Sequence, residues 1–487
     1  MNRLAWGLVL AATVWAQATV REVKSLPSWK DLTFPPLKEI KIPEPEVFTL
    51  PNGLKVFLLE NDELPLVSGF ALVRTGNLFD PPDKRGVADL TGTVMRSGGT
   101  TTKTGDEIDR ELEDIAASVE SSIGETSGTV GFSALKENTA QVLSIWRDVL
   151  EHAEFRQDKV QLAKTQMNSA IARRNDDPSG IASRELSSIV YGRETPYGWN
   201  IEHEHVNRIQ RDDLVAFYKR YFFPANIMVG IYGDFNSAEM RRTITDLLGS
   251  WDYKQPPLPA FPKLEAKAEP GIYLAEKPDV TQTFFEIGHI GGLLRDPDYP
   301  ALQVAGQILG SGFTSRLMRR VRTQLGYAYS IGAGWGAGYD KPGVFEISGS
   351  TKSKTTAETL SVILEEIQKL RTTEVTPEEL KIAKDSVINS FVFFFDRPSK
   401  TLNRLMMYEY FGYPKDFIFQ YQTAVGKVTR ADVLRVAKRY FQPENLSIVA
   451  VGNPRDFGSP LTTLKVPVHT LDITIPEPKE PAKRPGD

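Results

Sequence analysis

The stretch VNRIQRDDLVAFYKRYFFPANIMVGIYGD, residues 206–234, decides the fold because the chain contains it twice. It returns as VGKVTRADVLRVAKRYFQPENLSIVAVGN at residues 425–453, an offset of 425 − 206 = 219 positions. So many identical residues at one spacing indicate an internal repeat. The identical pairs are Lys219/Lys438, Arg220/Arg439, Tyr221/Tyr440, Phe222/Phe441, Pro224/Pro443, Asn226/Asn445 and Gly233/Gly452.

Each copy predicts a helix followed by a buried strand. RDDLVAFYKRYF is typical of a helix and IMVGIYGDF of a strand, and the second copy repeats both. A weaker echo relates GVADLTGTVMRSGG, residues 86–99, to LQVAGQILGSGF, residues 302–313. We therefore expect an α+β chain of two homologous domains, each a mixed, mainly antiparallel sheet with helices on one face.

Composition sets the expected domain boundaries. Residues 251–270 are rich in Pro, Lys and Glu, which is typical of a linker. They separate an N-terminal domain at 48–250 from a C-terminal domain at 271–456. The many prolines of residues 19–47 predict an extended arm. The Pro- and Lys-rich residues 457–487 predict a loosely held tail.

The first 18 residues have the pattern of a secretory signal peptide. Arg3 is followed by an apolar core at residues 6–15 and by Ala16-Gln17-Ala18, an A-x-A cleavage site. A membrane anchor or a buried N-terminal helix is the alternative, but the apolar run is shorter than the about 20 residues of a membrane span. The chain has no Cys, so it forms no disulfides. We expect a periplasmic or secreted protein.

Charge and hydropathy exclude two classes of partner. The 487 residues are 41% hydrophobic and 25% charged, which is ordinary for a globular protein of more than one domain. The formal net charge of −4 gives no reason to expect binding to nucleic acid. No segment after the signal predicts a membrane span in the mature chain.

Local sequence patterns predict the strands and helices of the N-terminal domain. Residues 54–59 and 66–76 predict strands, and a helix begins near Lys84. Two longer helical patterns cover residues 104–118 and 144–174, with a hairpin at 121–134 between them. Asp176-Asp177-Pro178 ends the second of these helices.

Residues 303–335, QVAGQILGSGFTSRLMRRVRTQLGYAYSIGAGW, contain the candidate functional residues. The pattern predicts a helix, a turn at Gly310 to Gly312, a second helix that ends with Arg322, and a strand that starts near Tyr329. A helix-to-strand reversal would aim both of those side chains into one cleft. The alternative is a surface arginine and a half-buried tyrosine. The glycines favour a close turn, because the Gly-Lys-Ser/Thr of a nucleotide cradle does not follow them.

Several of these segments together resemble the pitrilysin/insulinase-type zinc peptidases. They are the tandem units, LPNGLKVFLLEN (residues 50–61), the break at 176–178, TPYGWNIEHEHVNRIQRDDLVAFYKRYF (195–222) and SRLMRRVRTQLGYAYS (315–330). The resemblance covers residues 48–454. It is to the short, two-domain form, which is similar to mitochondrial processing peptidase subunits and their bacterial relatives.

The resemblance implies a degenerate zinc motif. Active members carry HxxEH and a distal Glu, in which two His and the distal Glu bind zinc and the inner Glu activates water. On this sequence the motif falls on Asp89-Leu90-Thr91-Gly92-Thr93, and the distal Glu falls at Ala170. Asp89 alone could ligate a metal, weakly. Gly92, Thr93 and Ala170 offer neither a base nor a strong ligand, so no cofactor is expected in this chain.

The resemblance implies that the C-terminal domain binds substrate and stabilises the transition state. In the family an Arg and a Tyr seven residues apart hold substrate carbonyl groups and stabilise the tetrahedral intermediate. Arg322 and Tyr329 match that spacing, since 329 − 322 = 7. Gly310 and Gly312 would border the peptide channel as substrate-binding residues. In paired bacterial members, one chain brings the zinc and another brings the Arg/Tyr pair.

The resemblance therefore implies the non-zinc subunit of an exported heterodimeric zinc metallopeptidase, inactive alone. Its partner would be a homologous HxxEH-bearing subunit that holds the zinc, and its substrates would be peptides. A catalytically silent scaffold or peptide-binding protein of the same fold remains an alternative. A self-sufficient peptidase with a relocated site is a third option, and metal analysis would test it.

Other suggestive residues have simpler interpretations. His203-Glu204-His205 has a metal-like spacing but is expected to be a fortuitous exposed pair. Arg316, Arg319 and Arg320 are expected to form a solvated basic face or structural ion pairs. Tyr327 should face the core, because alternate strand residues point to opposite sides.

Overall fold

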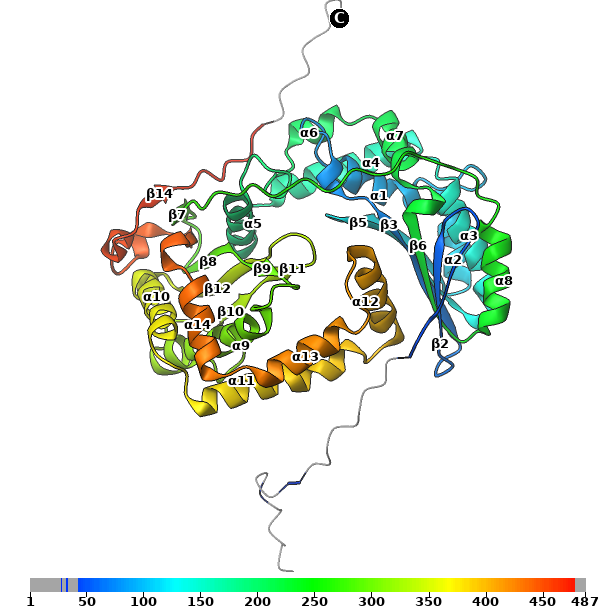
Figure 1. Cartoon of the computed structure of the whole chain (residues 1–487). Helices are drawn as coiled ribbons and strands as arrows, with labels where there is room; N and C mark the ends of the chain where they lie inside the picture. Colours follow the sequence, from blue (N-terminus) through cyan, green and yellow to red (C-terminus); the bar gives the residue numbers. More distant parts are fainter. Residues whose placement is uncertain (1–27, 29–31, 34–42, 478–487) are drawn as a thin grey trace, which may run out of the picture. The chain divides into compact units, whose positions relative to one another are not determined.

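The structure, a computed structural model, describes residue 28, residues 32–33 and residues 43–477 (Figure 1). The expected signal at residues 1–18 and almost all of the expected arm at residues 19–47 lie outside the described residues. From residue 43 onward the described residues belong to one compact unit. Within it, two six-stranded sheets contain the two copies of the repeat.

The first sheet is mixed and mainly antiparallel. Its order is β1-β2-β6-β3-β5-β4, and β2 runs parallel to β6 while the other neighbours are antiparallel. The strands are β1 (Glu46–Thr49), β2 (Lys55–Glu60), β3 (Leu66–Arg74), β4 (Ser118–Ile123), β5 (Ser127–Leu135) and β6 (Ile227–Gly233). The predicted hairpin at residues 121–134 is confirmed as β4 and β5.

The second sheet has the order β10-β12-β8-β13-β7-β14, in which β7 runs parallel to both β13 and β14. Its strands are β7 (Gly271–Glu276), β8 (Gln282–Ile290), β10 (Ile331–Trp335), β12 (Val344–Lys352), β13 (Ser447–Gly452) and β14 (Val468–Thr470). A separate two-stranded sheet pairs β9 (Gly292–Leu293) with β11 (Ala337–Gly338).

The two sheets have the same topology apart from one edge. Strands β2, β6, β3, β5 and β4 are neighbours in the order in which β7, β13, β8, β12 and β10 are neighbours. The outermost position beside β2 is filled by β1, which comes just before it in the chain. The equivalent position beside β7 is filled by β14, from the far end of the chain. The predicted fold class is confirmed.

Helices connect the strands in both halves. Those of the first half are α1 (Val87–Ser97), α2 (Gly105–Asp114), α3 (Thr139–Glu151), α4 (Gln157–Arg173), α5 (Pro178–Tyr191), α6 (His203–Arg208), α7 (Arg211–Tyr221) and α8 (Ser237–Leu248). Those of the second half are α9 (Tyr299–Gly310), α10 (Thr356–Thr372), α11 (Pro377–Asn389), α12 (Pro398–Phe411), α13 (Phe417–Lys427) and α14 (Arg430–Tyr440). Within the described part of the chain, no helix combines the length and the hydropathy that crossing a bilayer requires.

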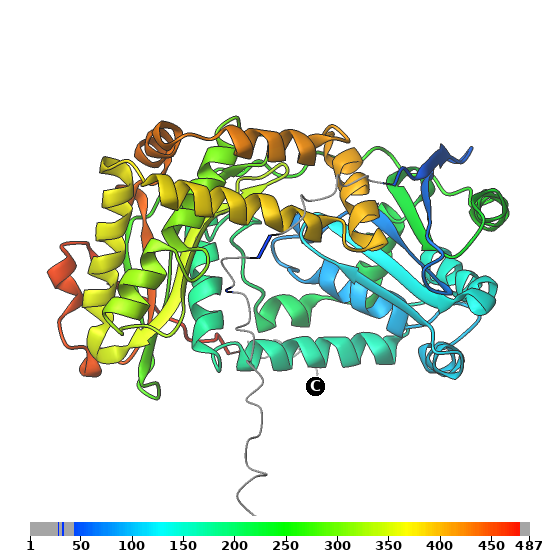
Figure 2. The same ribbon diagram turned by 90° about the horizontal axis from the view of Figure 1, so that it is seen from below.

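One face of each sheet is covered by helices of its own half. In the first half α1 lies on β4 and α3 on β5, with Leu58 and Trp146 buried between the layers. In the second half α9 lies on β10, with Phe345 and Leu360 in the corresponding core. Figures 1 and 2 show these layers from two directions.

The opposite face of each sheet is covered in part by a helix of the other half. Helix α5 lies on β8 and β13, where Ile181 and Leu186 belong to one buried cluster with Val449. Helix α12 lies on β2 and β6, and Leu402 and Met406 pack there against the first sheet. Both views show α12 beside these strands (Figures 1 and 2). The halves therefore exchange helices, which the sequence patterns did not predict.

The repeat has the same structure in both halves. Helix α7 leads into β6, and α14 leads into β13; the helices start 430 − 211 = 219 positions apart, as predicted. In the first copy, the Asn226 amide donates to the carbonyl oxygens of Tyr221 at 2.7 Å and Arg74 at 2.8 Å. These bonds fix the turn from helix to strand.

The single helix predicted over residues 144–174 is two helices. Helix α3 ends at Glu151 and α4 begins at Gln157. Between them Phe155 has φ +54° and is buried in the first core. Because an apolar pattern continues across the break, periodicity alone could not reveal the turn.

Part of the expected loose tail is a strand. The Leu471 N–H donates to the Leu274 oxygen at 2.8 Å, and the Asn175 amide donates to the Ile473 oxygen at 2.6 Å. A bare sheet edge exposes unpaired backbone groups, and β14 covers the edge of β7. Leu461 is also buried in the second core, with Phe457 and Leu464 packed against it, so the prediction of a loose tail was wrong for residues 457–473.

Residues 251–270, the expected linker, form no helix or strand but lie against the first half. The Phe261 ring stacks on Phe79 with centroids 5.1 Å apart. The Tyr197 hydroxyl donates to the Pro262 oxygen at 2.7 Å. This segment is therefore anchored on the first half before the chain enters β7.

Candidate functional site

The residues aligned with the zinc motif lie on α1, whose start is held by a buried carboxyl. Asp80 accepts hydrogen bonds from the backbone N–H of Gly86 at 2.6 Å and of Ala88 at 2.9 Å. Burial raises the pKa of Asp80 to about 7 despite these two donors. Gly86, at φ +101°, is the N-cap of the helix. Asp80 thus caps α1 from a distance.

Asp89 and Thr93 lie one turn apart on α1. The Thr93 hydroxyl donates to the Asp89 backbone oxygen at 3.0 Å, so the hydrogen of this hydroxyl is already used within the helix. Burial raises the pKa of the Asp89 carboxyl to about 6. Thr93 itself is exposed. Of the two outer motif positions, only Asp89 retains a group that can bind a cation.

Gly92 stands where the resemblance expects the general base, and the backbone of β4 fills the space beside it. A Cβ at this position would lie 2.5 Å from the Ile123 nitrogen. The Ser121 hydroxyl donates to the Gly92 oxygen at 2.6 Å. The close approach of α1 to β4 therefore requires a residue without a side chain here.

The residues present do not fit a zinc ion. Ala170 is exposed on α4, a helix that contacts α1. Among the residues that the structure describes, no group of three or more His, Asp or Glu side chains is placed to hold a metal. Asp89 is a single carboxylate, while zinc needs at least three protein ligands. The residues at the motif positions therefore cannot form the family's zinc site.

Arg322 and Tyr329 are brought together in the second half. The Arg322 guanidinium carbon lies 4.8 Å from the centre of the Tyr329 ring and 5.4 Å from that of Phe313. Tyr329 is 80% exposed and Phe313 is 74% exposed. The guanidinium therefore lies between two exposed rings, a favourable cation–π arrangement. Sequence reasoning missed Phe313, whose only signal was its place directly after the Gly-Ser-Gly turn.

The backbone around this pair is irregular. Arg322 lies in a π-helix, Met318–Gln324, a form that is frequent at functional sites. Gly326 follows at φ +64°, and the strand predicted to start near Tyr329 begins only at Ile331. Burial of Val321 and Ala328 anchors the segment on both sides of the turn. Tyr329 is consequently on a connecting segment and not on a strand.

Glycine is required at positions 310 and 312 for two different structural reasons. A Cβ at Gly310 would lie 2.2 Å from the Cβ of Ala333, because the end of α9 crosses β10 there. Gly312 has φ +82° and no atom within 4 Å of such a Cβ. Gly310 therefore permits close packing, and Gly312 permits a left-handed turn. Their expected role beside a peptide channel stays a prediction.

The other residues singled out from the sequence are structural. Arg316 binds Glu379 through two hydrogen bonds of 2.8 and 3.0 Å, and Arg319 reaches the same carboxylate at 3.4 Å, as predicted. Burial alone would raise the pKa of Glu379, but the bonds from Arg316 and the Thr376 backbone lower it to about 2. Tyr327 packs partly buried against the second core.

The prediction of an exposed histidine pair was wrong. His205 is buried, and its Nδ1 accepts from the Glu202 N–H at 3.0 Å in the cap of α6. Burial lowers the pKa of His205. His203 Nδ1 lies 2.6 Å from the Asn168 Oδ1. Both rings are held by local hydrogen bonds, because their helix is folded back against α4.

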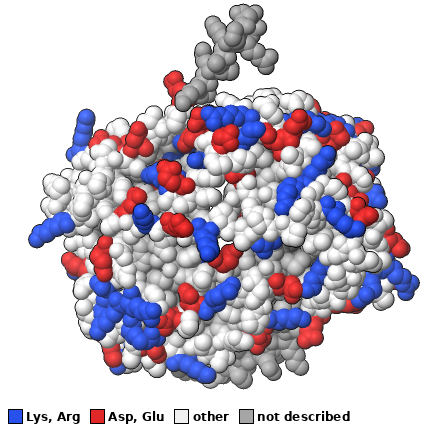
Figure 3. Space-filling view, turned by 45° about the horizontal axis from the view of Figure 1, so that its top comes forward, with Lys and Arg blue, Asp and Glu red and all other residues white. Residues whose placement is uncertain are grey.

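Charged side chains of both signs are mixed on the face shown in Figure 3, apart from one local basic cluster at its lower left. This distribution agrees with the small net charge of −4. It resembles neither the basic stripe of a nucleic-acid-binding protein nor a strongly acidic surface.

Two family models match the chain. Residues 56–201 match "Insulinase (Peptidase family M16)", and residues 208–387 match "Peptidase M16 inactive domain". An uncharacterized zinc protease of Rickettsia felis is 22% identical over 84% of this chain and 97% of its own length. The non-peptidase homolog YmxG of Helicobacter pylori is 25% identical over 81% of this chain and 91% of its own.

A solved structure has the same fold. The crystal structure of a peptidase M16 inactive domain from Pseudomonas fluorescens superposes with a TM-score of 0.75, at 22% identity, over 84% of this chain and 98% of that one. The two family models together match more than half of the chain, residues 56–201 and 208–387. The resemblance seen in the sequence is confirmed: this chain is a member of the insulinase, or M16, family of peptidases.

Proposed function

We propose that this chain is the non-zinc subunit of an exported heterodimeric zinc metallopeptidase. Its partner is a homologous subunit with an intact HxxEH motif, and Arg322 and Tyr329 complete the partner's site. The observation that carries the proposal is the contrast between the two halves. The zinc-motif positions have lost their ligands, whereas Arg322 and Tyr329 are adjacent and the tyrosine is exposed.

The chemistry of the pair supports this role. A guanidinium and a phenol are both hydrogen-bond donors, suited to an oxygen on which negative charge develops. The stack on Phe313 and Tyr329 limits the motion of the Arg322 side chain before a substrate arrives. In this proposal the partner's zinc activates water, and this chain's own residues bind the peptide carbonyl groups and stabilise the tetrahedral oxyanion.

The proposal is tested by co-expression with an HxxEH homologue from the same genome. We expect peptide cleavage by the pair and none by this chain alone. Arg322→Ala and Tyr329→Phe should each lower kcat by about 10²- to 10³-fold, the usual cost of one oxyanion donor. Arg320→Ala and Tyr327→Phe are the matched controls and should leave kcat unchanged. Full activity in the Arg322 and Tyr329 variants would overturn the assignment.

A catalytically silent scaffold is the second candidate, favoured by the relative that is named a non-peptidase homolog. In that case size-exclusion chromatography and co-purification would give a stable assembly without any HxxEH chain. The Arg322 and Tyr329 variants would then change no activity of any partner. Metal analysis of the purified chain tests a further point, because the proposal expects stoichiometric zinc only when the partner is present.

A further inference from the structure

The second half contains a cavity that the proposed peptidase function does not use. It has a volume of about 350 Å³ and lies among α9, α11, α12 and α13. This volume is within the usual range for small-molecule sites, about 300–1,000 Å³. Six of its fourteen lining residues are aromatic: Tyr299, Tyr339, Phe394, Tyr408, Phe417 and Tyr421.

Helix α12 contributes one cation to this cavity. Leu402 and Met406 face the first sheet, whereas Arg404 and Tyr408 line the cavity. The two pairs lie on opposite sides of α12, since residues four apart share a helix face and residues two apart do not. Among the described residues that line the cavity, Arg404 is the one charged side chain.

Arg404 is half-buried, and among the described residues no Asp or Glu forms an ion pair with it. Its Nε is buried and has no hydrogen-bond partner. Its guanidinium carbon lies 4.5 Å from the centre of the Phe394 ring and 5.9 Å from that of Phe395. Arg404 also interacts with the Tyr408 hydroxyl, which acts to lower the pKa of that phenol, but burial has the larger effect and raises it, so the phenol supplies no negative charge. An unmatched donor of a charged group in aromatic surroundings is costly, and a ligand that accepts a hydrogen bond would remove that cost.

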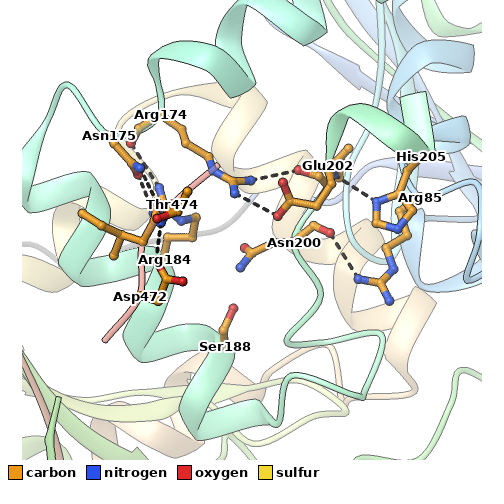
Figure 4. Close-up of polar contacts among 12 residues, drawn as sticks. Arg85, Arg174, Asn175, Arg184, Ser188, Asn200, Glu202, His205, Asp472 and Thr474 are labelled. Carbon is orange, nitrogen blue, oxygen red and sulfur yellow. Dashed lines mark hydrogen bonds and ion pairs between the residues drawn. The ribbon is translucent and has the colours of Figure 1, made fainter. Parts of the chain in front are cut away.

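The equivalent arginine of the first half shows what is missing. Helices α5 and α12 start 398 − 178 = 220 positions apart, so Arg184 corresponds to Arg404. Arg184 donates to the Glu185 carboxylate at 3.2 Å, to the Arg174 backbone oxygen at 3.1 Å and to the Asn175 side chain at 2.9 Å. Figure 4 shows Arg184 directed at Asn175, next to the Arg174–Glu202 ion pair.

Both side-chain acceptors are replaced by apolar residues in the second half. At the offset of 220, Glu185 corresponds to Leu405 and Asn175 to Phe395. The arginine is thus kept while the carboxylate and the amide that accept its hydrogen bonds are absent. An intrinsic structural need for this arginine would be expected to keep its acceptors as well. The difference indicates that the acceptor for Arg404 comes from outside the chain.

We propose that this cavity binds an organic monocarboxylate with an apolar, aromatic-sized body. The carboxylate accepts hydrogen bonds from Arg404, whose planar fork matches its two oxygens. The aromatic walls bury the body of the ligand, and the Gln307 amide, 2.8 Å from the Ser386 hydroxyl, offers a further polar contact. One cation matches one negative charge. A phosphate dianion would remain partly uncompensated among the rings.

The test is isothermal titration calorimetry on the full chain without any partner, so its outcome is independent of the proposed peptidase role. The probes are 3-phenylpropanoate, its neutral amide, and the peptide Ala-Ala-Ala-Phe with a free or an amidated C-terminus. We expect at least one acid to bind about tenfold or more tightly than its amide, as a charge-assisted hydrogen bond predicts. Binding of the free peptide acid would identify a C-terminal residue as the ligand; binding of 3-phenylpropanoate alone would identify a free acid.

Three variants distinguish carboxylate binding in this cavity from a general effect of the protein's charge on acid binding. Arg404→Gln should remove the preference for acid over amide, and Arg184→Gln, in the equivalent helix, should leave it unchanged. Ser390→Trp provides a second variant, because Ser390 lines the cavity but is itself exposed, so a large side chain can block the mouth without entering a core. Equal affinity for acids and amides, or full acid binding by Arg404→Gln and Ser390→Trp, would overturn the proposal.

Discussion

Gly92 allows α1 to approach β4 at a distance that no side chain would permit. In most helices Ala is more stable than Gly by about 1 kcal/mol. Here the Cβ of an alanine would lie 2.5 Å from a backbone nitrogen of β4. We therefore expect Gly92→Ala to destabilise the protein by about 1–3 kcal/mol, the usual cost of overpacking. Urea unfolding followed by circular dichroism measures this change.

The matched control is Gly426, in the last turn of α13, where a Cβ would meet no atom within 4 Å. Gly426→Ala should stabilise the protein by up to about 1 kcal/mol. If both substitutions were stabilising, the close contact between α1 and β4 would not be the reason for the glycine. Restoring a glutamate at position 92 should be more harmful than alanine, because a longer side chain meets the same strand.

Individual residues were predictable where a local pattern or a family spacing determined them. The spacing of Arg322 and Tyr329 was visible in the sequence, and the structure brings the two side chains together. Phe313 was not predicted, because no spacing rule links a residue after the Gly-Ser-Gly turn to Arg322. Arg404 was not predicted, because the cavity that it lines is formed by distant segments. The burial of His205 was missed for the same reason, since α4 and the segment before α6 enclose it.

Strand β14 completes the second sheet with residues from the far end of the chain. Truncation after Lys465 would expose the β7 edge and remove Leu471 and Ile473 from their buried cluster. We expect a loss of about 2–3 kcal/mol of stability, in line with the burial of one or two aliphatic side chains. The bare edge should also promote self-association, which size-exclusion chromatography with light scattering detects.

A point substitution provides the comparison for this truncation. Asn175→Ala removes the hydrogen bond to the Ile473 oxygen and the one from Arg184 but leaves β14 in place. It should cost about 0.5–1.5 kcal/mol and cause no association. A truncated chain that stayed monomeric and as stable as the full chain would show that β14 does not protect the edge.

At the level of elements, the repeat made the pairs α7–β6 and α14–β13 predictable. The exchange of α5 and α12 was not predictable, because an amphipathic pattern says that a helix has an apolar face but not which sheet it covers. The docked tail was missed because prolines and lysines dominate its composition, while the few apolar residues that bind it, such as Leu471, are widely spaced.

The exchanged helices predict that both halves unfold together. Leu402 is fully buried but belongs by sequence to the second half while packing on the first sheet. Leu402→Ala should cost about 2–5 kcal/mol and lower the stability of both halves equally. Two variants that each retain a single tryptophan, Trp146 in the first core or Trp335 in the second, report on the halves separately.

We expect the two fluorescence transitions in urea to coincide, and to shift by the same amount in Leu402→Ala. Coincident transitions from different probes are the usual test of two-state unfolding. If the substitution moved only the Trp146 transition, the helix exchange would join the halves without coupling their stability.

The position of α12 in the sequence also determines when the first sheet can be covered during synthesis of the chain. Strand β6 is complete when Gly233 has been added, but the helix that covers its second face ends at Phe411. A ribosome adds about 5–20 residues per second. Phe57 and Leu59 of the first sheet therefore stay uncovered for roughly ten seconds or more, until α12 has been synthesised. We expect a nascent chain with this uncovered apolar surface to bind a holding chaperone during that interval, and we expect neither half to be obtained alone as a well-behaved fragment.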